Sequence, residues 1–68
     1  MNPDKLCKID KIAELLESKI KLLRLKHDTS VLILIAPTHR KKILEITDKL
    51  IKKIDEEVEE LLKELEIQ

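Results

Sequence analysis

An uninterrupted aliphatic run, VLILIA at residues 31–36, is the feature that most constrains how this chain can fold. If the run is extended, alternate side chains point to opposite faces, and both faces are apolar. This is typical of a strand that is buried on both sides. Pro37 follows directly and would end the strand, because proline cannot donate a hydrogen bond to a β-ladder. The pattern therefore predicts a short strand at residues 31–36.

This strand would have no partner within its own chain, because no second stretch of the 68 residues has a strand-like pattern. Unpaired backbone donors and acceptors are costly to bury. The simplest source of a partner is the same strand of another copy, so we expect a homo-oligomer, a dimer or higher, with intersubunit strand pairing. The alternative is an all-α chain in which Ser30 caps a second helix that runs through residues 31–36 and is kinked at Pro37.

The segment before the run predicts a helix at about residues 3–26. Asn2, Pro3 and Asp4 suit a helix start, since they can cap free amides, occupy the first turn and complement the helix dipole. Apolar residues then recur at alternating spacings of three and four, which is a heptad pattern. They are Leu6, Ile9, Ala13, Leu16, Ile20 and Leu23. We expect this series to face the second helix, with Leu15, Leu22 and Leu25 left as surplus apolar surface for higher assembly or for another protein.

The segment after the run predicts a second helix at about residues 38–66, with Thr38 as its N-cap. Its heptad series is Leu44, Thr47, Ile51, Ile54, Val58, Leu61 and Leu65. The expected fold is therefore mainly α with one short strand, in the order helix–strand–helix. We expect residues 1–68 to form a single small domain, a long antiparallel helical hairpin that assembles as a helical bundle.

Charge along the second predicted helix is segregated. Residues 38–53 carry six Lys or Arg against two acidic residues, and residues 54–68 carry seven acidic residues against one Lys. Two copies of this helix packed antiparallel would place each basic half beside an acidic half. In a hairpin, the basic end of the first helix would add to this charge and make a basic pole around Arg40–Lys42.

Two sets of site residues follow from these patterns. The expected oligomer interface comprises Val31, Leu32, Ile33, Leu34, Ile35, Leu44, Ile51, Ile54, Val58 and Leu61. The candidate contacts for an anion or a nucleic-acid backbone are Lys19, Arg24, Lys26, Thr38, His39, Arg40, Lys41 and Lys42. The zero net charge and the absence of aromatic residues, which stack on unpaired bases, argue against nucleic-acid binding.

No pattern of a catalytic, cofactor or metal site emerges, and we expect no enzyme activity, cofactor or bound metal. His27 and His39 lack companion ligands at metal-binding spacing, and Cys7 is the one cysteine, so no internal disulfide can form. We expect a cytoplasmic protein, because the aliphatic run is too short to span a bilayer and a lone cysteine fits a reducing compartment. The Lys, Glu and Ile excess resembles that of proteins from hot environments. The predicted function is a small oligomeric module for structure or protein interaction; the alternative is a nucleic-acid-binding regulator that uses the basic pole.

Overall fold

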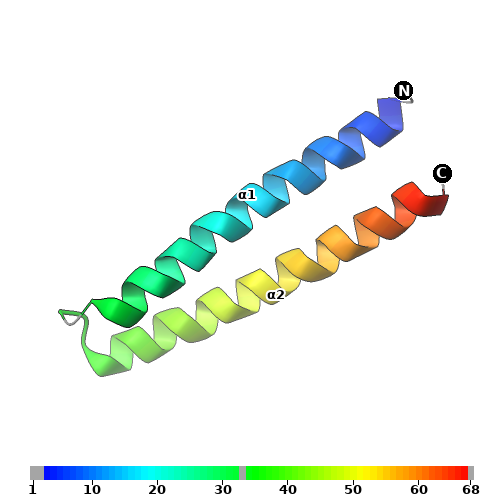
Figure 1. The fold of residues 1–68 in the computed structure, drawn as a ribbon. Helices are drawn as coiled ribbons and strands as arrows, with labels where there is room; N and C mark the ends of the chain where they lie inside the picture. Colours follow the sequence, from blue (N-terminus) through cyan, green and yellow to red (C-terminus); the bar gives the residue numbers. More distant parts are fainter. Residues whose placement is uncertain (1–2, 33, 68) are drawn as a thin grey trace.

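The structure is a computed structural model that describes residues 3–32 and 34–67. Two long helices, α1 (Pro3–Val31) and α2 (Pro37–Ile67), run antiparallel and pack along their length. Both chain ends lie at one end of this hairpin and the turn lies at the other (Figure 1). The hairpin is long and thin, with extents of 49 × 15 × 11 Å. The predicted antiparallel helical hairpin is confirmed, and the part of the chain that the structure describes is all-α.

The predicted strand at residues 31–36 is wrong. The first helix does not stop at residue 26 but continues through the predicted turn to Val31. The Leu32 amide still donates a helical bond of 3.0 Å to the Asp28 carbonyl, and the Ser30 hydroxyl donates to the Lys26 carbonyl at 2.9 Å. The Leu32 amide thus has a partner four residues back along its own chain and needs no second strand.

The chain reverses within residues 32–36, of which Ile33 lies outside the described residues. Because the described residues contain no strand, the structure offers nothing for the predicted intersubunit strand pairing. The alternative of an all-α chain is confirmed for the described residues, but its second helix, capped by Ser30 and kinked at Pro37, is wrong: Ser30 lies within α1, and α2 begins at Pro37.

Pro37 opens the second helix. The first intrahelical bond runs from the Arg40 amide to the Ala36 carbonyl at 2.9 Å, which makes Ala36, and not Thr38, the residue that precedes the helix. Proline is well suited to the first helical position, where its missing amide hydrogen would have no partner. The bounds of α2 lie within one residue of the predicted 38–66.

Two helices alone do not enclose a core. Among the described residues no hydrophobic side chain is fully buried; the only buried residues are two threonines, Thr29 and Thr47. A side chain on the contact line between two helices still meets solvent on both flanks. The hairpin is therefore held by half-buried contacts and lacks the closed interior typical of a stable domain.

Candidate interaction surface

The inner face of α1 differs from the predicted one. Its less exposed residues recur at spacings of three and four, and half of them are lysines. They are Lys5, Lys8, Ile12, Leu15, Lys19, Leu22, Lys26 and Thr29, here called the α1 seam. Leu15 and Leu22, expected on the surplus surface, lie on this inner face instead. Leu25 is exposed, as expected.

The inner face of α2 agrees with the predicted heptad. All seven residues of that series are half-buried or buried, among them five of the expected interface residues, Leu44, Ile51, Ile54, Val58 and Leu61. These five line the contact with α1 of the same chain, and a role for them between subunits stays a prediction. The remaining expected interface residues lie at the turn, where Val31, Leu32 and Leu34 are exposed, Ile35 is half-buried and Ile33 is not described.

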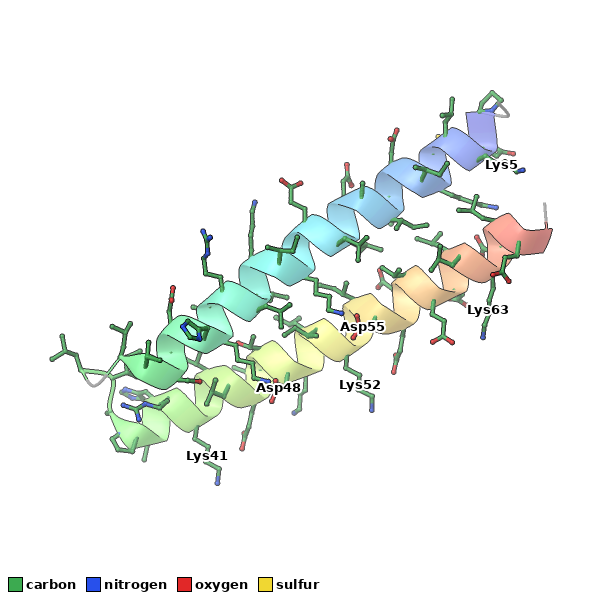
Figure 2. All side chains as sticks on the ribbon, in the orientation of Figure 1. Lys5, Lys41, Asp48, Lys52, Asp55 and Lys63 are labelled. Carbon is green, nitrogen blue, oxygen red and sulfur yellow. The ribbon has the colours of Figure 1, made fainter. Side chains whose placement is uncertain are left out.

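Ion pairs explain why lysines face α2. Lys26 Nζ lies 2.7 Å from Asp48, Lys19 Nζ 2.6 Å from Asp55, and Lys8 Nζ 3.6 Å from Glu64. Asp48 and Asp55 lie between the helices, whereas Lys41 and Lys52 point away from α1 (Figure 2). Pairs this exposed contribute little stability each, about 0–1 kcal/mol. Their value is in fixing the antiparallel register while the lysine stems cover apolar surface of the seam.

The predicted heptad of α1 is left on the outside. Each member directly follows a seam residue, and one residue is a rotation of about 100° around a helix. We call this series the α1 stripe: Leu6, Ile9, Ala13, Leu16, Ile20 and Leu23. Its five large side chains are between 41% and 65% exposed. The most regular apolar series of α1 therefore has no partner within the described hairpin.

Further apolar side chains are exposed elsewhere, without a comparable series on one helix. They are Leu25, Val31, Leu32 and Leu34 in α1 and the turn, and Ile46, Leu50 and Leu62 in α2. Leu34, at 96%, is the most exposed of them and lies at the tip of the turn.

The turn is held by Arg40. Its guanidinium Nη2 donates to the Leu32 carbonyl at 2.9 Å and to the Ile35 carbonyl at 3.2 Å. Leu32 follows the last residue of α1, so Arg40 ties the end of α1 and the turn to α2. Its Nε is buried without a hydrogen-bond partner. Arg40 was expected at a nucleic-acid contact, but in this fold it is engaged in holding the chain reversal.

The other candidate anion contacts divide into two groups. Lys19 and Lys26 are engaged by the aspartates of α2. The remaining ones, Arg24, Thr38, His39, Lys41 and Lys42, are exposed in the half of the hairpin that contains the turn.

The two halves of the molecule carry equal and opposite net charges. The half that contains the turn, residues 18–53, carries ten Lys or Arg and three Asp or Glu. The open half, residues 3–17 and 54–67, carries four Lys and eleven Asp or Glu. The two halves thus have net charges of about +7 and −7 at neutral pH, counting aspartate and glutamate as ionised. The hairpin is neutral as a whole, but its positive and negative charges are separated along its length.

Other chemistry is sparse on the described residues. No three His, Cys, Asp or Glu side chains among them are grouped to hold a metal ion, His27 and His39 are exposed, and Cys7 is an exposed free thiol. A shallow open depression on α2 is lined by charged side chains alone, Glu56, Glu59, Glu60 and Lys63. Neither described helix is long and apolar enough to cross a membrane.

Comparison of the chain with protein-family models, with curated proteins and with solved structures finds no match.

Proposed function

We propose that this chain is a helical interaction module, a hairpin that presents the α1 stripe to another helical surface and completes its hydrophobic core between proteins. One observation carries this proposal: the hairpin has no fully buried hydrophobic side chain among its described residues, yet an apolar heptad runs along the outside of α1. Heptad series of this kind pack against helices. The function requires no catalytic group.

The available free energy is of the right size. Full burial of a Leu or Ile side chain contributes roughly 1.5–3 kcal/mol, so covering the exposed part of each large stripe residue gives about 1 kcal/mol. Two such stripes packed together would contribute roughly 10 kcal/mol, which lies within the estimated 4–15 kcal/mol cost of associating two molecules. The balance is close, so association would also depend on how well the flanking charges match.

The proposal is tested by polar substitution at the middle of the stripe. In the double variant Leu16→Gln with Ile20→Gln, two large exposed side chains lose their apolar character while the inner seam is unchanged. We expect the wild type to form assemblies at tens of micromolar in light scattering and the variant to form none. The matched control, Glu14→Gln with Lys21→Gln, changes exposed α1 residues outside both the seam and the stripe and should behave like the wild type.

A different result would contradict the module. A wild-type chain that is monomeric, fully helical and as stable as the double variant would show that the stripe needs no partner. If the wild type is monomeric and poorly helical, its hairpin still requires a partner surface and the proposal stands.

A second function, binding to a nucleic-acid backbone, is favoured by one observation, the charge of about +7 on the turn half. The exposed cations Arg24, Lys41 and Lys42 would make the contacts. Replacing these three with Gln should lower duplex affinity and flatten its dependence on salt, whereas Lys63→Gln in the open half should change neither. Affinity that is absent at low salt, or unaffected by the triple change, would contradict this function.

A further inference from the structure

We propose that the α1 stripe is covered by the α1 stripe of a second copy of this chain, packed antiparallel about a two-fold axis that passes between Ala13 and Leu16. The inference rests on the proposed function and deepens it by naming the partner. It differs from strand-mediated pairing, for which the described residues hold no strand.

The stripe is complementary to its own reversed copy. Reversal about its centre places Leu6 opposite Leu23 of the second copy, Ile9 opposite Ile20, and the small Ala13 opposite Leu16. Every position therefore meets an apolar residue. Pairing of the first heptad position with the fourth is the usual arrangement of an antiparallel two-helix contact. The contact would extend over about 26 Å at 1.5 Å per residue.

Apolar matching alone does not fix the orientation, because a parallel copy would also pair apolar residues. The charge distribution fixes the orientation of the second copy. In an antiparallel dimer the turn half of one hairpin, with ten cations and three anions, lies beside the open half of the other, with four cations and eleven anions. A parallel dimer would place like beside like at both ends, which is strongly disfavoured. The reversed copy of this chain is thus the electrostatic complement of the chain itself.

The charged residues on either side of the stripe would also lie at the contact between the two copies. On the side toward α2, Lys19 and Lys26 are already neutralised by Asp55 and Asp48, so covering the stripe leaves these two lysines paired. On the other side lie Asp10, Glu17 and Arg24, all exposed. Reversal brings Asp10 of each copy within side-chain reach of Arg24 of the other. The same reversal places Glu17 of each copy about 3 Å along the axis from Asp10 of the other and about 7.5 Å from its own counterpart, so like-charge approaches accompany the Asp10–Arg24 pairs on this side.

Disulfide trapping tests both surface and orientation in the full chain. In a Cys7→Ser background, one chain carries Leu6→Cys and a second, tagged chain carries Leu23→Cys. Antiparallel packing predicts that the mixture forms the mixed disulfide, since the two cysteines would be opposite each other. Either variant alone should form none, because the cysteines of its two copies would be about 26 Å apart along the axis. We expect the mixed product to exceed either homodisulfide by at least tenfold.

In the matched control, the two cysteines lie at nearly the same positions along the helix axis as Leu6 and Leu23, but on the face of α1 outside the stripe. Wild-type Cys7, which is exposed and outside the stripe, is mixed with Lys21→Cys in the Cys7→Ser background. These cysteines should not form a rapid mixed disulfide. Homodisulfides from the stripe positions would overturn the antiparallel arrangement in favour of a parallel one.

A charge exchange gives a second, independent readout. Arg24→Asp should weaken dimerisation several-fold in sedimentation equilibrium, because it places a second acidic residue near Asp10 of the other copy, and the double exchange with Asp10→Arg should restore it. Failure of the double exchange to restore affinity would overturn the predicted contact.

An oligomer that crosslinks at neither stripe position would overturn the inference but leave the interaction module standing, because another surface then associates. A stable helical monomer would overturn both.

Discussion

At the scale of single residues, Arg40 is the side chain on which the chain reversal most depends. Its guanidinium donates to two carbonyls of the turn, at Leu32 and Ile35, and hydrogen bonds from charged donors are among the stronger ones in proteins. We expect Arg40→Ala to lower the free energy of unfolding by roughly 1–2 kcal/mol, measured by urea denaturation at fixed chain concentration. The neighbouring Lys41 points away from α1, so Lys41→Ala should change stability little (Figure 2). Equal effects of the two substitutions would contradict this role.

Thr47 is the second residue with a defined prediction. It is 2% exposed in the α2 heptad, and its hydroxyl donates to the Ile43 carbonyl at 2.6 Å, one turn back along the same helix. The Ile43 carbonyl is also the acceptor for the helical bond of the Thr47 amide, so the hydroxyl competes with the backbone for it and adds little stability. Thr47→Val keeps the branched shape and should raise the free energy of unfolding by roughly 0.5–1 kcal/mol, seen as a higher melting temperature. Thr38→Val, at an exposed site, is the control; a loss of stability in Thr47→Val would contradict the prediction.

At the scale of one helix, the neighbours Leu15 and Leu16 separate the two faces of α1. Leu15 is half-buried in the seam, whereas Leu16 lies on the stripe and is 42% exposed in the hairpin. If the stripe is covered in the assembly, Leu16→Ala should destabilise it by about 2–3 kcal/mol, as much as Leu15→Ala. If the hairpin acts alone, Leu16→Ala should cost less than about 1 kcal/mol while Leu15→Ala stays costly. Urea denaturation of both variants at the same concentration decides between them.

The elements also show what the sequence can predict. The α2 heptad and the bounds of α2 could be predicted, because the apolar residues form a long series with regular spacing. The run at residues 31–36 could not, because an apolar stretch that short has no periodicity of its own. The Leu32 amide donates a helical hydrogen bond to the Asp28 carbonyl within α1, so the start of the run has a local backbone partner and the expected strand does not form.

The two faces of α1 were misassigned for an electrostatic reason. The series with the most apolar residues was expected to face α2, yet the inner series contains Lys8, Lys19 and Lys26. Their partners, Glu64, Asp55 and Asp48, lie on another helix, and their match depends on the antiparallel register. A signal was present in the sequence, since these lysines share a heptad series with Ile12, Leu15 and Leu22. It becomes informative only when both helices are aligned.

At the scale of the whole molecule, the opposite charges of the two halves predict a definite response to salt. An antiparallel dimer is held partly by attraction between turn half and open half, and salt screens such attraction. Raising NaCl from about 50 to about 500 mM shortens the screening length severalfold and should weaken dimerisation roughly 3- to 10-fold in sedimentation equilibrium. A parallel dimer would be strengthened by the same change, because salt would then screen repulsion.

The central claim is that this hairpin is complete only when its outer stripe is covered, since no hydrophobic side chain among the described residues is fully buried within it. The most direct test is helical content, followed by circular dichroism at 222 nm, over a thousandfold dilution of the chain. Coupled folding and association predicts that helicity falls on dilution and that the melting temperature depends on concentration. A chain that stays fully helical at nanomolar concentration, with a melting temperature independent of dilution, would contradict the claim.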